Sequence, residues 1–212
     1  MSNKDFQNGF AVGMASKGQA QVSVPNPLEY APMFTQAFMA VTFPENYELA
    51  LDLPRVTNLT SLFHNSRNMV KLTVKGNTDN NKVTLNSAFR APHLVILDFS
   101  EFNAKIGSCT YMCYDAISLK EIKGVLDFSE CTATTSFLNN CKALEEFRVL
   151  PNSIKSSISI PSSPNLSVDT KQSIIDGLAT VETAQTLTLN SAIVLTDEQK
   201  ATIETKGWTL VQ

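Results

Sequence analysis

The sequence predicts an α/β solenoid, in which a chain wound into successive coils stacks along one axis. The main observation is an apolar spacing of 25 residues that recurs without a slip. It places four residues in a first column: Leu72, Leu97, Ile122 and Phe147. A second apolar column lies three positions earlier and holds Met69, Leu94, Leu119 and Leu144. Self-similarity at a fixed period of about 20 to 50 residues is the signature of repeat architectures.

Two further columns support this prediction. A third apolar column, two residues after the first, holds Val74, Phe99 and Val149, with Gly124 as the exception. Small residues lie six positions before the first column: Ser66, Ala91, Ala116 and Cys141. The pattern L-x-x-L-x-L is that of leucine-rich repeats, here of about 25 residues. Its last two apolar positions share one face of a strand, so the copies are predicted to stack as a parallel strand ladder.

The repeats are also predicted to extend toward the N-terminus. Continuing the phase backwards puts Tyr47 in the first column and Leu49 two residues later. A fifth, degenerate repeat is therefore expected at about 37–49. Apolar residues alternate strictly from Tyr47 to Leu53, which predicts a strand with one buried face. A helix is expected before this strand, over residues 28–40.

After the regular repeats, a helix is expected over 171–180. Asp169 or Thr170 could serve as its N-cap, because both side chains can accept a hydrogen bond from the first turn. The apolar phase then returns, with Leu187 at a first-column position and Leu189 two residues later. This predicts one more repeat, separated from the others by an insertion.

The last segment is predicted to form a helix and a strand that cap the core. Thr196 begins the string T-D-E-Q, a capping box with Gln199 at the third helical position. Gly207 can supply the left-handed turn that ends this helix. Trp208 and Leu210 then alternate as in a strand. Terminal caps cover the open core of repeat proteins and keep them soluble.

Three segments follow from these expectations: an N-terminal arm at 1–27, a leucine-rich repeat solenoid at 28–168, and a C-terminal repeat and cap at 169–212. The arm departs from the repeat pattern and is rich in glycine, which keeps its backbone loose. We expect four apolar side chains of the arm to dock on another protein or on a second copy of the chain: Phe6, Phe10, Val12 and Met14.

Composition excludes several classes of function. The formal net charge is −3, so there is no excess of basic residues to neutralise phosphates, and a nucleic-acid partner is not expected. No stretch approaches the roughly 20 apolar residues that span a bilayer. The apolar run from Phe10 to Ala15 is shorter than the core of a secretory signal, so no signal peptide is expected.

Catalytic and metal-binding motifs are absent from the sequence. There is no phosphate-binding glycine loop, no G-x-S-x-G and no H-E-x-x-H. The two histidines, His64 and His93, are interpreted as turn or surface residues. The cysteines lack a C-x-x-C spacing and are interpreted as buried free thiols rather than zinc ligands. They are Cys109, Cys113, Cys131 and Cys141. We expect no cofactor and no metal, and we predict that the chain is not an enzyme.

A glycan-cleaving enzyme is nevertheless kept as an alternative, because glycosidases work with two carboxylic acids. The visible pairs are Asp98 with Glu101, Asp127 with Glu130, and Glu145 with Glu146. The first two pairs share the string D-F-S-E, which favours a repeated loop over an acid and base couple.

The outward side of the predicted ladder is the candidate binding surface. Extended faces of this kind are what repeat proteins use to bind partners. Its side chains carry mixed charges and include an apolar patch. The candidate residues are Lys71, Thr73, Val95, Ile96, Asp98, Lys120, Lys123, Glu146 and Arg148. The alternative interpretation is a solvated sheet face whose charges only pair with one another.

Several strings resemble the BspA-like leucine-rich repeats of bacterial surface proteins: SAFRAPHLVILDF, SFLNNCKALEEFRVLPNSI and SISIPSSPNL. The resemblance covers residues 60–165 and departs from the family in its irregular connectors and in Gly124. The arm NGFAVGMASKG and the ending LTLNSAIVLTDEQKATIETKGWTLV look like those of leucine-rich-repeat proteins encoded in phages and prophages of gut bacteria.

This resemblance implies a structural or recognition component of a phage particle, of tail, fibre or head-decoration type. The protein would be made in the bacterial cytoplasm and located in the virion. The arm would attach to other virion proteins, and the repeats would be displayed toward a partner protein or a host-surface glycan. The alternative is a bacterial surface adhesin or binding module. The resemblance implies no catalytic residues in this sequence.

Overall fold

The computed structural model describes residues 20–22, 35–53, 55–76 and 82–212. Within these residues the regular structure is mostly parallel strands arranged in sheets, with few helices. Most of the predicted arm lies outside the described residues, including Phe6, Phe10, Val12 and Met14. Of the described helices, none is both long and apolar enough to cross a bilayer.

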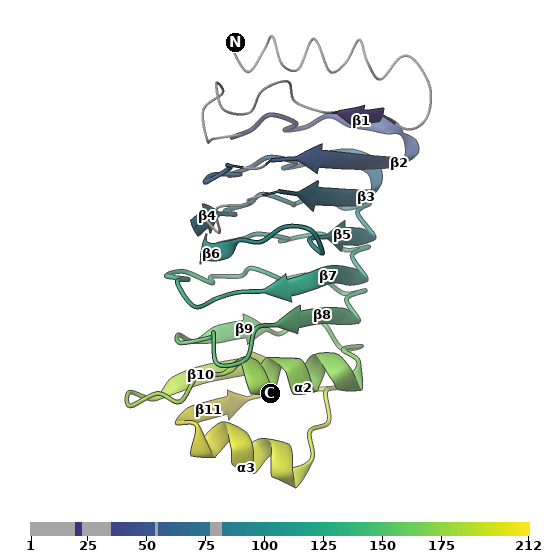
Figure 1. Ribbon diagram of the computed structural model, residues 1–212. Helices are drawn as coiled ribbons and strands as arrows, with labels where there is room; N and C mark the ends of the chain where they lie inside the picture. The colour runs from purple at the N-terminus through teal and green to yellow at the C-terminus, as the bar shows by residue number, and fades with distance from the viewer. Residues whose placement is uncertain (1–19, 23–34, 54, 77–81) are drawn as a thin grey trace.

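The main sheet has six strands in the order β1-β2-β3-β5-β7-β8. Figure 1 shows these strands lying one above another along the long axis of the molecule. We call the chain from one strand of this sheet to the next a coil. The strands are β1 (Ala20–Val22), β2 (Thr42–Asp52), β3 (Arg67–Lys75), β5 (Ile96–Asp98), β7 (Glu121–Leu126) and β8 (Glu146–Val149).

The remaining elements lie between and after these strands. A two-stranded sheet joins β4 (Lys82–Thr84) to β6 (Lys105–Ser108), and a three-stranded sheet has the order β11-β10-β9. The latter contains β9 (Ile158–Ile160), β10 (Gln185–Leu189) and β11 (Trp208–Val211). Helix α2 spans Val168–Gly177, and helix α3 spans Asp197–Thr205.

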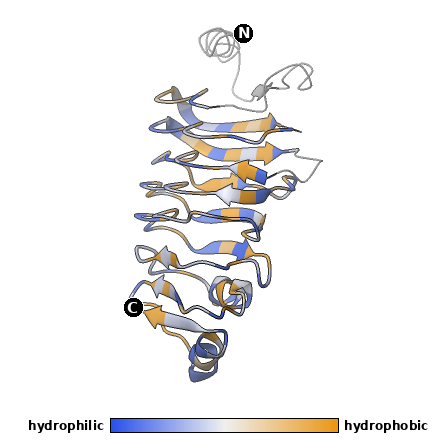
Figure 2. Ribbon diagram, turned by 90° about the vertical axis from the view of Figure 1, so that its left-hand side faces the viewer, coloured by the Kyte–Doolittle hydropathy of each residue, from blue (hydrophilic) through white to orange (hydrophobic). Residues whose placement is uncertain are grey.

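The first apolar column lies in direct register inside the main sheet. Leu49 pairs with Leu72, Leu72 with Leu97, and Leu97 with Ile122. Phe147 follows in β8, the next strand of the sheet. Each of these side chains is at most 2% exposed. Hydrophobic and hydrophilic residues alternate along the strands in Figure 2, as a sheet with one buried face requires. The predicted buried column from Leu72 to Phe147 is therefore confirmed.

The first coil differs from the prediction. Tyr47, expected in the first column, pairs with Met69 of the second column, and Leu49 takes the first-column place. Strand β2 shifts register on both sides of Tyr47. Because a bulge inserts residues into one strand only, a fixed spacing assigned Tyr47 to the wrong column.

The gap in the third column at Gly124 is closed by Leu126. Strand β7 shifts register between Glu121 and Val125, so that Leu126 pairs with Val149 and is 3% exposed. Gly124 has φ +87°, and a Cβ atom there would lie 2.8 Å from the carbonyl of Phe99. This bulge therefore requires glycine, and it moves the inward apolar side chain two residues along the strand.

The segments that precede the strands also pair from coil to coil. They form turns, and their backbone N–H groups donate to carbonyls of the next coil at 2.8–2.9 Å. The pairs are Phe38 to Leu62, Phe63 to Ala88, Phe89 to Met112, and Cys113 to Phe137. The helix expected over 28–40 is wrong in its described part, because residues 35–40 form such a turn instead.

Helix α2 covers the edge of β8, where a further strand would otherwise pair. The Thr170 hydroxyl accepts the N–H of Phe147 at 3.2 Å, and the Ser173 hydroxyl accepts the N–H of Val149 at 2.9 Å. The helix lies so close that a Cβ atom at Gly177 would be 2.7 Å from Val149 Cγ1. Side-chain oxygens thus satisfy donors that an uncovered edge would leave open.

Two C-terminal predictions are wrong in detail. The N-cap of α2 is Ser167, not Asp169 or Thr170, and the helix ends at Gly177 rather than at residue 180. Leu187 does not continue the first column, because β10 pairs with β9 and places Leu187 beside Ile158. The apolar spacing was read correctly, but α2 already occupies the place next to β8.

The predicted C-terminal helix and strand are confirmed. The Thr196 side chain accepts the N–H of Gln199, and the Gln199 side chain accepts the N–H of Thr196, as a capping box requires. Gly207 has φ +86°. Trp208 is buried and donates from Nε1 to the carbonyl of Ala179 at 2.8 Å, which ties the cap to the body.

Replacing Thr170 with valine tests the helix as an edge cover. Valine keeps the shape but leaves the buried N–H of Phe147 without its acceptor, so we expect a loss of about 1–3 kcal/mol in the free energy of unfolding. Urea unfolding followed by circular dichroism measures this loss. Thr209→Val, at an exposed position of β11, is the control and should change stability by about 0.5 kcal/mol or less. Equal effects of the two variants would contradict the role of α2.

Candidate binding surface

The nine candidate residues lie on the outward face of β3, β5, β7 and β8 or immediately before these strands. We call this surface the ladder face: Lys71, Thr73, Val95, Ile96, Asp98, Lys120, Lys123, Glu146 and Arg148. They are half-buried or exposed, whereas the residues between them in the strands point into the core. Because side chains alternate across a strand, the buried columns determine which residues face outward.

Most of the ladder face is arranged in the predicted rows. Lys71 pairs with Ile96, and Thr73 pairs with Asp98, which pairs in turn with Lys123. One position before these strands, the N–H of Lys120 donates to the carbonyl of Val95 at 2.9 Å. The structure therefore brings these side chains together in adjacent coils.

Arg148 departs from its predicted row. It was expected beside Lys123, but the bulge in β7 places it beside Val125. Glu146 keeps its predicted position and pairs with Glu121. The bulge at Gly124 causes this misplacement, because it also shifts Val125 and Leu126 relative to β8.

The charges of the ladder face are only weakly paired. Lys71 lies 3.9 Å from Glu48, Lys123 lies 3.9 Å from Glu121, and the Arg148 guanidinium lies 3.7 Å from the Asp169 carboxylate. Pairs that are this long and exposed contribute about 0–1 kcal/mol. These groups can therefore exchange their partners for a ligand at small cost.

Asp98 is the candidate whose ionisation is most shaped by its surroundings. Partial burial opposes its charge, but hydrogen bonds from the Ser100 hydroxyl and N–H, with the charges of Lys123 and Lys71, outweigh burial and lower the pKa of Asp98. Asp98 is thus held as a carboxylate at neutral pH and acts as an acceptor.

A hollow of about 130 Å³ lies at the C-terminal end of the ladder face, between β7, β8 and α2. Three predicted residues line it: Lys123, Glu146 and Arg148. Gly124 also lines the hollow, at the point where strand β7 shifts register. Positive and negative groups meet there, so the hollow offers donors and acceptors to a polar ligand without favouring one sign of charge.

Three polar residues of this hollow are absent from the predicted candidates: Glu121, Asp169 and Thr170. Asp169 and Thr170 were assigned to a helix cap, and their place beside the sheet depends on the contact of α2 with β8. The only signal in the sequence was Gly124, which interrupts an otherwise apolar column.

Two of the three carboxylate pairs of the glycan-cleaving alternative have a member that is engaged elsewhere. Glu101 accepts from Lys75 at 2.6 Å, and Glu130 accepts from Lys105 at 2.9 Å, each from the preceding coil. The hydrogen bond and charge of Lys105 lower the pKa of Glu130. A glycosidase needs one carboxyl with a raised pKa as general acid. Neither Asp98 nor Glu130 meets that requirement.

The cysteines were predicted to be buried free thiols, and the histidines to be turn or surface residues. Cys109, Cys113 and Cys141 are buried and Cys131 is half-buried, all as free thiols. His93 is exposed and its Nδ1 accepts the N–H of Asn68 at 3.0 Å. Among the residues that the structure describes, no three His, Cys, Asp or Glu side chains gather as a metal site would need.

A second polar surface, which sequence reasoning missed, lies on the turns. We call it the tyrosine cluster: Arg90, Tyr111, Tyr114, Asp115 and Asn140. The Tyr111 and Tyr114 rings meet edge to face at 5.4 Å, and the Arg90 guanidinium lies 4.8 Å from the centre of the Tyr114 ring. Asp115 accepts from Asn140 at 2.7 Å and lies 3.7 Å from Arg90.

Tyr111 is an unusual residue for its place in the fold. It has φ +56° and is 40% exposed. The equivalent position of other coils also has positive φ, and it holds the small residues Ser61, Ser87 and Ser136 in three coils and Gln36 in the first. A bulky residue in the left-handed region carries more strain than a small polar one, and packing does not require its exposed ring.

No family model matches the chain, and neither a curated protein nor a solved structure matches it. Function is therefore inferred from the ladder face and its hollow.

The lowered pKa of Asp98 predicts that this carboxylate contributes to the loss of folding stability in acid. A carboxyl whose folded pKa lies below its ordinary value stabilises the fold above that ordinary value, and this stabilisation is lost as the pH falls through the folded pKa. Between about pH 6 and pH 3, the urea midpoint of Asp98→Asn should therefore fall less than that of the parent chain. Glu182→Gln, on the exposed segment before β10, is the control and should follow the parent. An unchanged acid dependence in Asp98→Asn would refute the assignment.

Proposed function

We propose that the chain is a BspA-like leucine-rich-repeat solenoid that serves as a non-enzymatic recognition component of a phage particle. The ladder face contacts a partner protein or a host-surface glycan, and the N-terminal arm attaches the chain to the virion. The alternative location is the surface of a bacterium, where the same face would make the protein an adhesin.

One observation carries the binding role: outward side chains from consecutive coils lie in register beside a hollow. Lys71, Thr73, Asp98 and Lys123 belong to paired positions of rigid strands. Groups fixed on strands lose little freedom when they bind, which favours affinity. The weak ion pairs on this face leave its charges available.

The leucine-rich-repeat assignment is supported by the spacing of the apolar columns and their parallel register. Coils of similar length place Leu72, Leu97 and Ile122 side by side. The phage assignment rests on the resemblance of the arm and of the C-terminal ending. The carboxylates of the D-F-S-E strings pair with Lys75 and Lys105, which disfavours the enzymatic alternative.

Reversing two charges in the hollow tests the ladder face as a binding surface. The double variant is Lys123→Glu and Arg148→Glu. It adds two carboxylates to the three that already line the hollow, those of Glu121, Glu146 and Asp169. We expect binding to intact gut-bacterial cells, or to the polysaccharide purified from them, to weaken about tenfold or more, as a loss of about 1.4 kcal/mol implies. Binding of fluorescently labelled protein measures this change.

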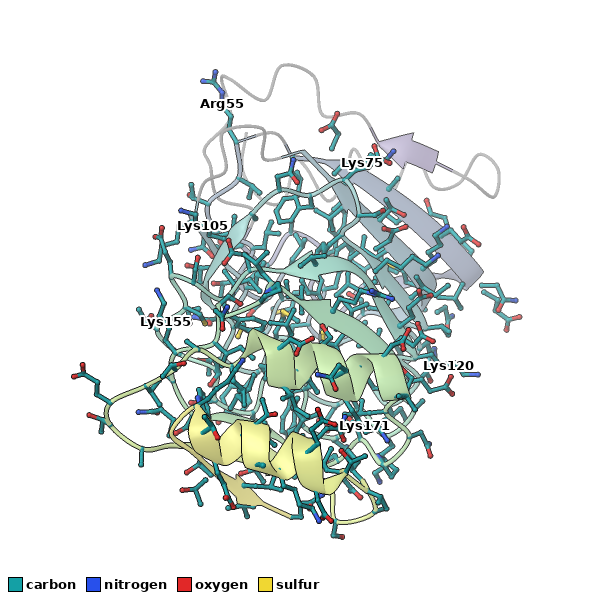
Figure 3. The ribbon with its side chains drawn as sticks, turned by 60° about the horizontal axis from the view of Figure 1, so that its bottom comes forward. Arg55, Lys75, Lys105, Lys120, Lys155 and Lys171 are labelled. Carbon is teal, nitrogen blue, oxygen red and sulfur yellow. The ribbon has the colours of Figure 1, made fainter. Side chains whose placement is uncertain are left out.

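Two control variants locate the surface. Lys155 lies on the opposite side of the molecule from Lys120 of the ladder face (Figure 3), so Lys155→Glu should leave binding unchanged. Tyr111→Ser introduces the residue found at the same step of neighbouring coils. If Tyr111→Ser abolishes binding while the double variant keeps it, the ligand binds the tyrosine cluster and the ladder-face proposal fails.

Removing the arm tests attachment to the virion. Deletion of residues 1–24 should abolish incorporation into particles of the phage that encodes the chain, as detected by immunoblotting of purified particles. Because the deletion also removes β1, which pairs with β2, a second variant replaces only Phe6, Phe10, Val12 and Met14 with serine. Particles that incorporate both variants at the parent level would rule out docking by the arm.

A further inference from the structure

Two thiols from successive coils face each other near the surface. The sulfur atoms of Cys109 and Cys131 are 3.9 Å apart. Both lie near one backbone oxygen, the carbonyl of Ala133, at 3.6 Å from Cys109 and 3.5 Å from Cys131. This contact belongs neither to the ladder face nor to the tyrosine cluster.

The backbones that carry the two thiols are held side by side. The N–H of Cys109 donates to the carbonyl of Ala133 at 2.9 Å, and the N–H of Thr132 donates to the carbonyl of Gly107 at 3.0 Å. These bonds fix the two segments beside each other and hold the sulfur atoms 3.9 Å apart. A disulfide bond is about 2.05 Å long, so the sulfur atoms must approach each other by about 2 Å to form one.

The two thiols differ in access and in acidity. Cys109 is fully buried and Cys131 is half-buried. The hydrogen bond to Cys131 and burial raise the pKa of Cys109 well above its ordinary range. The hydrogen bond from Cys109 lowers the pKa of Cys131 despite partial burial, and the positive charge of Lys82 acts in the same direction. Cys131 is thus the thiol that solvent reaches and that ionises first.

Lys82 is positioned for this role by the fold. Its side chain lies across Gly107, where a Cβ atom would come within 2.7 Å of Lys82 Cγ. The missing side chain at Gly107 leaves room for the lysine side chain in this position. From there the positive charge of Lys82 favours the thiolate form of Cys131.

Packing alone does not require a thiol at position 109. The equivalent N–H groups of the two preceding coils belong to Leu59 and Leu85, which donate to Thr84 and Ser108 as Cys109 donates to Ala133. Both leucines are buried in the same core. A leucine therefore suits this place in the coil, whereas the cysteine brings a second sulfur to Cys131.

We propose that Cys131 is a modification site for low-molecular-weight disulfides and that Cys109 resolves the adduct, closing a reversible disulfide between neighbouring coils. The Cys131 thiolate attacks one sulfur of a disulfide such as oxidised glutathione, and one glutathione leaves as thiolate and takes up a proton. Cys109 then loses its proton and attacks the Cys131 sulfur, and the second glutathione leaves. Two protein thiols are oxidised, and one glutathione disulfide is reduced to two thiols.

The reaction would depend on the compartment. Thiols stay reduced in the cytosol, and disulfides persist outside it. The coils would therefore be joined after the protein leaves a reducing cell, and the closed loop would restrict the unfolded chain and raise its resistance to denaturation. This inference is independent of the proposed binding function.

The full chain, purified under reducing conditions and then freed of reductant, is incubated with oxidised glutathione. We expect the four titratable thiols of the unfolded protein to fall to two, with a mass loss of two hydrogen atoms and no retained glutathione. Peptide mapping should find Cys109 joined to Cys131. Dithiothreitol should restore all four thiols, and the oxidised form should melt at a higher temperature than the reduced form.

Three variants separate this reaction from general thiol oxidation. Cys109→Ala should retain one glutathione on Cys131, because the resolving thiol is missing. Cys131→Ala should neither retain glutathione nor close a disulfide. Cys141→Ala is the matched control, because Cys141 is buried, and burial raises the pKa of its thiol to about 12; it should react like the parent.

Four unreacted thiols in the parent chain, or a disulfide joining any other pair, would overturn the proposal. So would disulfide closure in Cys131→Ala, or a glutathione adduct that persists on the parent chain. If Cys109→Ala does not fold, mapping of the parent chain decides alone.

Discussion

The structure depends on one constraint: every coil must find partners for its backbone N–H and C=O groups in the coils above and below it. Paired strands meet this demand on one side, and the turns that pair Phe38, Phe63, Phe89 and Cys113 with the following coil meet it on another. An unpaired buried backbone group costs about as much as a lost hydrogen bond. Coils of nearly equal length are therefore favoured. Because the coils have nearly equal lengths, their buried apolar residues recur at a nearly constant spacing in the sequence.

The same constraint explains what happens where the main sheet ends. Strand β8 has donors on its free edge, and open edges invite association with other chains. Here the hydroxyls of Thr170 and Ser173 on α2 accept these donors. Further along the chain, the ammonium of Lys206 donates to the carbonyls of Ile175, Asp176 and Leu178 at 2.7–3.1 Å, which satisfies the C-terminal end of the same helix. Side chains of the C-terminal part of the chain thus supply the hydrogen-bond partners that a further coil would otherwise provide.

Sequence periodicity predicted the buried column and the outward residues because both follow from alternation across strands. It could not locate bulges, since an inserted residue changes the pairing without changing the residue types around it. Tyr47 and Arg148 were misplaced for this reason, whereas Gly124 marked the bulge only as a break in a column. Leu187 has the apolar spacing of a further repeat, yet it pairs with Ile158 of β9 because α2 occupies the edge of β8. The hollow was missed because it lies beside the bulge of β7 and depends on the approach of Asp169 and Thr170 in space.

The constraint also separates residues that the fold uses from residues that it leaves free. Glu101 and Glu130 each reach back to a lysine of the preceding coil, so these exposed carboxylates hold coils together. Lys71, Lys123 and Arg148 make only long contacts and are not needed in the same way. Tyr111 holds a strained backbone position that serine occupies in three other coils, and Cys109 stands where leucine is found in two other coils. Where successive coils pair position by position, the equivalent position in a neighbouring coil is an internal control for what packing requires. Residues that differ from this control, or that the fold leaves unpaired, are where binding and chemistry can be selected without disturbing the stack.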